Sequence, residues 1–105
     1  MATFEDREKE FEARFKHDQE LRFKVTARRN RLAGLWAAEK MGLSGEAAAG
    51  YAKTVVDAEF SGGDHHVVEK LVADLAAKGQ SFTPAQVQFE LNHFAETAKK
   101  QVMSE

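Results

Sequence analysis

The stretch "TFEDREKEFEARFKHDQE", residues 3–20, combines a high density of charged side chains with a regular spacing of phenylalanine. Phe4, Phe11 and Phe15 are separated by seven and by four positions. Because a helix advances about 100° per residue, this spacing places the three rings on one narrow stripe. The stretch therefore predicts an amphipathic helix near the start of the chain.

The apolar stripe changes direction after this stretch. The next apolar residues that share a face are Leu21, Val25, Leu32 and Trp36. At about 100° per residue they cluster about 80° away from the phenylalanine stripe. The intervening "KHDQE", residues 16–20, contains no apolar side chain. A straight helix cannot direct both stripes at one partner, so we expect an N-terminal arm over residues 1–19 and a helical bundle domain over residues 20–105.

Helix-start and helix-stop signals divide the rest of the chain, and the alternation typical of β-strands is absent. The first expected helix begins after an N-cap at Thr3, with Asp6 three residues on, and continues to Met41. The second runs from about Gly45, after an N-cap at Ser44, to Phe60, and the third runs from an N-cap at Asp64 to Gly79. The fourth begins at a capping box of Thr83, Pro84 and Gln86. Short loops favour antiparallel neighbours, so the predicted fold class is all-α, a four-helix bundle with a long first helix. The residues expected to be buried together are Leu32, Trp36, Leu71, Leu75, Leu91 and Phe94.

Composition places the chain among small globular proteins. Its 105 residues suffice for one domain, and a hydrophobic fraction of 43% is too high for a disordered chain. There is no cysteine, which excludes disulfides and thiolate metal sites. No apolar run approaches the length of about 20 residues that a membrane span requires, and the acidic start lacks a secretory signal. We therefore expect a cytoplasmic protein without direct membrane insertion.

Signals for an enzyme are weak, and we expect a non-catalytic protein with neither a catalytic nor a metal site. His65 and His66 are adjacent, so a helix directs them about 100° apart, which suits surface histidines better than ligands of one metal ion. The "SGGD" sequence at residues 61–64, expected to be a loop, has neither the preceding strand nor the lysine of a phosphate-binding loop.

A basic stretch, "LRFKVTARRNR" at residues 21–31, has five Lys or Arg residues and no acidic one. Phosphates attract such side chains, so a weak nucleic-acid binder is one hypothesis. The net charge of the whole chain is −2, however, its pI is about 6.1, and no interleaved aromatic platform accompanies the stretch. A solvated helix face, or a docking face for an acidic protein, is favoured, and no nucleic-acid partner is expected.

The arm itself has two interpretations. It is either a solvated helix end whose phenylalanines pack loosely on the bundle, or a segment that docks on a partner. Amphipathic helices that bind in apolar grooves use spaced aromatic anchors of this kind, and exposed apolar rows tend to mark binding sites. Under the second interpretation, Phe11 has no partner in the bundle.

Two segments carry a resemblance to a known family, "FEDREKEFEARF" at residues 4–15 and "RRNRLAGLWAAEKMGLSG" at residues 28–45. Together with "YAKTVVDAEF" at residues 51–60, they resemble the zeta subunit, the inhibitor of F-type ATP synthases in alphaproteobacteria. The resemblance extends over essentially the whole chain.

The resemblance implies a four-helix bundle with an inhibitory arm that is mobile and intrinsically disordered in the free protein. The arm would become helical on insertion at a catalytic interface between alpha and beta subunits, where it blocks rotation in the hydrolysis direction. Within the arm, the candidate partner-binding residues are Phe4, Arg7, Glu8, Phe11, Arg14 and Phe15.

The partners that the resemblance implies are the alpha and beta subunits of the ATP synthase head, with the gamma subunit as a further candidate. The protein would be a monomer when free and would bind peripherally, on the cytoplasmic side of the membrane-bound enzyme.

An alternative hypothesis from another class stays open. The chain could be a small helical module that binds a ligand such as a nucleotide, or a protein-interaction module of another kind, with the arm as a frayed end. No cofactor is expected to be required, and the residues identify no nucleotide pocket.

Overall fold

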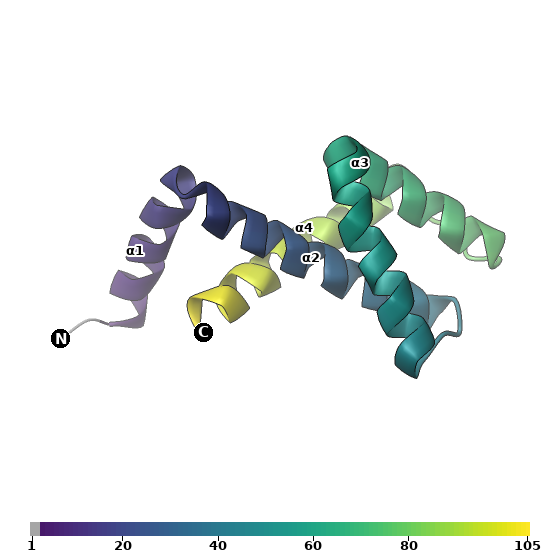
Figure 1. Cartoon of the computed structure of the whole chain (residues 1–105), viewed down its shortest axis with the longest axis horizontal. Coiled ribbons are helices and arrows are strands. Elements are labelled where there is room, and N and C mark those ends of the chain that lie inside the picture. Colours follow the sequence, from purple (N-terminus) through teal and green to yellow (C-terminus); the bar gives the residue numbers. More distant parts are fainter. Residues whose placement is uncertain (1–2) are drawn as a thin grey trace.

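The computed structural model describes residues 3–105 and consists of helices and short connections over this range, without a strand (Figure 1). The helices are α1 (Phe4–His17), α2 (Gln19–Lys40), α3 (Gly45–Ala77) and α4 (Pro84–Met103). α2 lies at the centre of the molecule and contacts each of the other three. The all-α fold class expected from the sequence is confirmed.

The long first helix expected from the sequence is broken at Asp18, inside the apolar gap at residues 16–20. Asp18 has an extended backbone, with φ −100° and ψ 103°. Its N–H donates to the Arg14 carbonyl at 2.8 Å, which closes α1, and its carboxylate accepts from the Leu21 N–H at 3.0 Å, which opens α2. One residue therefore caps two helices, and the change in stripe direction corresponds to a change in chain direction.

The predicted end of α2 and the predicted start of α4 are confirmed. Gly42 follows α2 with φ 81°, and the Leu43 N–H donates to the Ala38 carbonyl at 2.8 Å, which is the hydrogen bond of a Schellman ending. Thr83 and Gln86 form the expected capping box at the start of α4, with hydrogen bonds of 3.1 and 2.8 Å. Local signals thus suffice to place both ends.

The break expected at residues 61–64 is confirmed in position, because two helical segments of α3 meet at a kink at Gly63, but the expected loop is wrong, since the helix is interrupted at this one residue. Gly63 has φ 73° and ψ −163°, a conformation that essentially only glycine adopts, so the chain turns there without a separate loop. Asp64 was expected to cap a new helix, but its carboxylate binds Arg29 of α2 instead. Ser44 precedes α3 without making a side-chain capping hydrogen bond.

The main core lies between α2, α3 and α4. The leucines expected in it are fully buried there, namely Leu71, Leu75 and Leu91. Trp36 and Phe94 are only partly buried and pack against the core with ring centroids 6.3 Å apart. Leu32 belongs to a different cluster at the other end of α2. The expectation of one common core is therefore correct for the leucines of α3 and α4 but wrong for Leu32.

Gly34 allows α2 and α3 to approach closely. A Cβ atom at this position would lie 2.7 Å from the Ala52 Cα and 3.2 Å from a methyl group of Val55. Because the nearer of these atoms belongs to the backbone of α3, it cannot move aside as a flexible side chain would. The distance between the two helices therefore depends on a glycine at this position.

A polar network joins α2 to the kink of α3. The Arg29 side chain, on a residue that is 8% exposed, donates to Glu59 at 2.9 Å and to Asp64 at 2.8 Å. The buried Asn30 amide also donates to Glu59, at 3.1 Å. Burial raises the pKa of Glu59, whereas the hydrogen bond from Arg29 lowers the pKa of Asp64. The two carboxylates flank Gly63 in sequence, so the network holds the kink from both sides.

Gly34→Ala should destabilise the protein, whereas Gly50→Ala should stabilise it. A Cβ at Gly50 meets no atom within 4 Å, so this substitution should show the helix preference for alanine, about 0.5–1 kcal/mol. At Gly34 the contact with α3 outweighs that preference, and we expect a net loss of about 1–3 kcal/mol. Urea unfolding followed by circular dichroism measures both. Equal stabilisation by the two substitutions would contradict the close approach of α2 and α3.

Asp64→Asn should lower stability by an amount that depends on pH. Because Arg29 lowers the pKa of Asp64 below its usual 3.8 in the folded protein, the ionised carboxylate stabilises the fold above pH 3.8. This contribution is lost as the pH falls through the lowered folded value. Since 60% of the Asp64 side chain is exposed, the loss should stay within about 1 kcal/mol.

The measurement compares free energies of unfolding of the wild type and Asp64→Asn at about pH 6 and about pH 2. The two proteins should differ at the higher pH and converge at the lower one. Asp57→Asn, at an exposed position on α3, is the matched control. A difference between wild type and Asp64→Asn that persists undiminished at low pH would show that it does not arise from the charge.

Candidate functional site

α1 is closed at both ends by hydrogen bonds with residues next to it in the chain. At its start the Asp6 N–H donates to the Thr3 hydroxyl at 3.1 Å, and the Thr3 N–H donates to the Asp6 carboxylate at 3.2 Å. The expected N-cap at Thr3 is thus confirmed, and Asp18 closes the other end. A helix of 14 residues is marginal in water when isolated, so contacts with the bundle add to these caps.

Phe11 is at the centre of those contacts, and the expectation that it has no partner in the bundle is wrong. Only 7% of Phe11 is exposed. It forms a second core cluster with Val25 of α2 and with Ala98 and Val102 of α4. The break at Asp18 is the physical reason, because α1 changes direction there relative to α2 (Figure 1), and Phe11 packs against α2 and α4.

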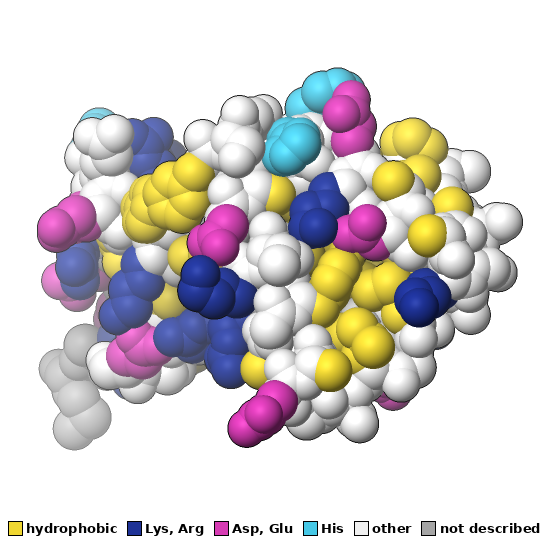
Figure 2. Space-filling view, turned by 45° about the vertical axis from the view of Figure 1, so that its right-hand side comes forward, with side chains coloured by type: hydrophobic (Ala, Val, Ile, Leu, Met, Phe, Trp, Pro, Cys, Tyr) yellow, Lys and Arg dark blue, Asp and Glu magenta, His cyan; other side chains and the backbone are white. Residues whose placement is uncertain are grey.

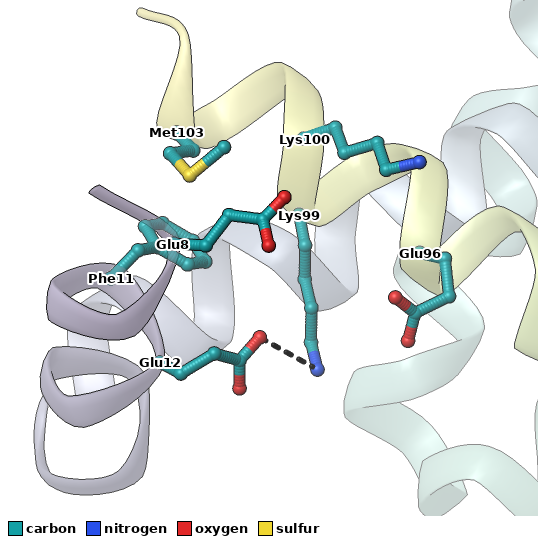
Figure 3. A pocket seen from close by; sticks show the side chains of 7 residues that line it. All are labelled: Glu8, Phe11, Glu12, Glu96, Lys99, Lys100 and Met103. Atoms are coloured by element: carbon teal, nitrogen blue, oxygen red, sulfur yellow. Dashed lines mark ion pairs between the residues drawn. The ribbon is translucent and has the colours of Figure 1, made fainter. Parts of the chain in front are cut away.

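Lys99 of α4 reaches across to α1. Its ammonium nitrogen lies 4.6 Å from the centroid of the Phe15 ring. The same nitrogen lies 3.6 Å from a carboxylate oxygen of Glu12, and Figure 3 shows this ion pair. The Phe15 ring is in turn stacked on Phe11, with centroids 6.3 Å apart and planes inclined by 21°. The cation–π contact and the ion pair each contribute at most about 1 kcal/mol at a partly exposed site. We call the contact of Phe11, Phe15 and Glu12 with α2 and α4 the arm seam.

A cavity of about 220 Å³ lies beside the arm seam, between α1 and α4. Its lining residues are Glu8, Phe11, Glu12, Glu96, Lys99, Lys100 and Met103. Figure 3 shows Glu8 and Glu12 of α1 directed toward α4, where Lys99 points back toward Glu12. Most of the lining is charged, so this space is polar rather than part of the apolar core. α1 is therefore attached to α4 along an aromatic seam with a polar gap beside it.

The six candidate partner-binding residues differ in how far the bundle covers them. Phe11 and Phe15 lie in the arm seam, and Glu8 lies at the edge of the adjoining cavity. Glu8 is exposed at that edge, and the remaining candidates are exposed away from the seam, namely Phe4, Arg7 and Arg14. Of these, Phe4 is the large apolar one, and 57% of it is accessible to solvent. The structure brings the first three residues together and leaves the other three accessible from outside.

The seat of the arm on α4 was not predicted from the sequence. The apolar face of α4 continues beyond the main core to Ala98 and Val102, which lie in the cluster around Phe11. This continuation is visible in the sequence as a signal that something covers the last turns of α4. The sequence alone does not identify the covering element, because the break at Asp18 decides where α1 lies.

Residues 3–105 contain no group of three His, Cys, Asp or Glu side chains placed to hold a metal ion. Over the same residues, every helix is too short or too polar to cross a membrane.

Comparison with known proteins identifies the family of the chain. A protein whose structure was determined by NMR in solution is 40% identical in sequence, in an alignment that covers 80% of this chain and 96% of that one, and the two folds agree with a TM-score of 0.70. No curated protein matches. A family model described as ATPase inhibitor subunit zeta matches residues 1–101, almost the whole chain. The chain therefore belongs to the ATPase inhibitor subunit zeta family.

Proposed function

We propose that this protein inhibits ATP hydrolysis by an F-type ATP synthase without catalysing a reaction itself, and that α1 is the inhibitory element. α1 inserts at a catalytic interface between alpha and beta subunits, near the gamma subunit, and blocks rotation. Membership of the zeta family supports the inhibitory role. The observation that supports α1 as the inhibitory element is its construction as a separately capped helix, attached to the bundle by the arm seam.

Insertion requires α1 to leave its seat on α4. Burying a phenylalanine side chain contributes about 1.5–3 kcal/mol, so releasing Phe11 into water costs a similar amount. A cleft in the enzyme offsets this cost if it buries the same ring again. The polar cavity beside the seam limits the further cost of release, because Glu8 and Glu12 are not packed in an apolar environment. The Phe11 ring thus leaves one apolar contact, on the bundle, and enters another, in the enzyme.

Exposed side chains of α1 are available for the first encounter with the enzyme. Phe4 lies near the tip of the arm, and Arg7 and Arg14 extend from its exposed surface. None of these three takes part in the arm seam, so they can contact the enzyme while Phe11 is still seated on α4. Charged side chains at such an encounter mainly increase the rate of association, and a central aromatic side chain contributes most to affinity.

In this proposal the protein is a monomer when free and binds peripherally to the enzyme, on the cytoplasmic side of the membrane. The bundle stays outside the catalytic interface and carries the arm.

Phe4→Ala should weaken inhibition without affecting stability. Because Phe4 is 57% exposed, its removal should change the free energy of unfolding by less than about 0.5 kcal/mol. If the ring is buried in the enzyme, its loss should raise the concentration for half-maximal inhibition by about thirtyfold, the equivalent of about 2 kcal/mol. Titration of ATP hydrolysis by purified ATP synthase heads measures this.

The matched control for Phe4→Ala is Phe89→Ala, which removes another exposed ring, 70% accessible, from α4. This control should inhibit like the wild type. If Phe4→Ala also inhibits like the wild type, the tip of the arm is not inserted, and α1 is not the inhibitory element in the form proposed.

Phe11→Ala should release the arm from the bundle in the free protein. The substitution removes the buried ring of the arm seam, so backbone amides of residues 4–17 should exchange with solvent faster. Amides around Leu91 in the main core should keep their protection, because that core contains no residue of α1. Hydrogen exchange read by NMR measures both sets in one sample. Equal acceleration of the two sets would show that arm and bundle open as one unit.

A further inference from the structure

Two exposed phenylalanines from different helices form a pair on the bundle. Phe23 of α2 is 53% exposed and Phe60 of α3 is 65% exposed, yet their ring centroids lie 5.2 Å apart. A slot between the two helices, lined among others by Ala27 and Val56, adjoins both rings. Two large apolar side chains gathered at one exposed place, rather than scattered singly, tend to mark a site of interaction.

Basic side chains border this aromatic pair. A shallow groove along α2 and α3 is lined by Glu20, Phe23, Lys24, Ala27, Arg28, Arg31 and Val56. Three of these residues are basic and one is acidic, although the whole chain has a net charge of −2. In Figure 2, Lys and Arg side chains gather beside exposed hydrophobic ones on one face of the molecule. The groove is thus a positive and apolar surface on a protein that is negative as a whole.

The chain itself shows that this surface binds a carboxylate. The side chain of Glu105, the last residue described, is paired with both Lys24 and Arg28. The hydrogen bond from Lys24, with a second from Arg28, lowers the pKa of Glu105. Because 38% of the Glu105 side chain is exposed, a carboxylate from another molecule can compete for the same cations.

This surface is separate from the arm seam. It draws residues from α2 and α3 and none from α1. Phe23 also lies two positions from Val25, which contacts Phe11, and two positions correspond to about 200° around a helix. A partner can therefore occupy this side of α2 while α1 is seated on α4 or inserted elsewhere.

We propose that this second surface, formed by Phe23, Lys24, Arg28, Arg31, Val56 and Phe60, docks an acidic segment on the outside of the ATP synthase head. An apolar side chain of that segment lies against the rings of Phe23 and Phe60, and its carboxylates bind Lys24, Arg28 and Arg31. We call it the α2 docking surface. The inference rests on the proposed function, because it names a second contact with the same enzyme.

An acidic protein segment fits this surface better than a nucleic acid does. The apolar part of the surface suits a side chain such as leucine or phenylalanine, and three basic residues can neutralise two or three carboxylates. The net negative charge of the whole chain would also repel a long polyanion. Docking here would tether the arm near its target and raise its effective concentration, so affinity would rise without any change in the arm.

The test uses full-length Arg31→Glu and Phe60→Ala, both at exposed positions. Each variant should raise the concentration for half-maximal inhibition by about tenfold, while inhibition at saturation stays complete, because the arm is intact. The matched controls are Lys78→Glu at the exposed end of α3 and Phe89→Ala on α4, and both should behave as wild type. Raising the ionic strength should weaken wild-type inhibition more than inhibition by Arg31→Glu.

The outcomes separate this inference from the proposed function. If the wild type neither binds nor inhibits purified ATP synthase heads, the proposed function fails. If the wild type inhibits and both Arg31→Glu and Phe60→Ala match their controls, the α2 docking surface is wrong and the arm mechanism is unaffected. Fluorescence titration with a single-stranded oligonucleotide tests whether the surface binds nucleic acid instead. Binding that Arg31→Glu abolishes, without any change in inhibition, would assign the surface to nucleic acid and overturn the proposal.

Discussion

Asp18 determines where the first helix of this chain can go. Its N–H closes α1 and its carboxylate opens α2, so two helices meet at a single extended residue. Without this break, residues 4–40 would form one rod of about 55 Å at about 1.5 Å per residue. The longest dimension of the whole molecule is 51 Å. The seat of Phe11 on α4, and with it the second core cluster, exists because the chain turns at this residue.

The arm seam attaches α1 to the bundle through few contacts, so α1 can also detach from it. One buried ring, one stacked ring and one lysine hold α1, and a polar cavity takes the place of further apolar packing on one side. The interior of the bundle has a different character, because three leucines without solvent exposure pack there between α2, α3 and α4. Local opening of the arm should therefore cost less free energy than opening of the bundle. An arm that inserts into a partner requires this difference, because it must detach while the bundle stays folded.

Close packing and a polar network join α2 to α3 near the surfaces that the bundle carries. Gly34 sets the close approach of α2 to α3, and the network of Arg29 with Glu59 and Asp64 holds the kink at Gly63. Phe60 stands on α3 just before that kink, so the same network also fixes its position beside Phe23 of α2. In the proposed assembly, the arm and the α2 docking surface act on one enzyme from two sides of α2, and the bundle sets the distance between them.

The sequence by itself determined the helical fold class, the caps at Thr3 and Thr83, the ending at Gly42 and a change of direction within residues 16–20. Each of these depends on residues close together in the chain, whose side chains bond to nearby backbone or leave a gap in a periodic pattern. The sequence also identified the phenylalanine stripe of the arm and, by resemblance, the zeta family.

Only the tertiary structure decided that Phe11 is buried, that α3 kinks at Gly63 instead of ending in a loop, and that Asp64 binds Arg29 rather than capping a helix. Phe11 meets Val102 across most of the chain, and Phe23 meets Phe60 across two helices. A periodic pattern shows which side of a helix is apolar. It does not show which distant surface covers that side, because this depends on the angles between helices, and those angles are set by contacts between residues far apart in the sequence.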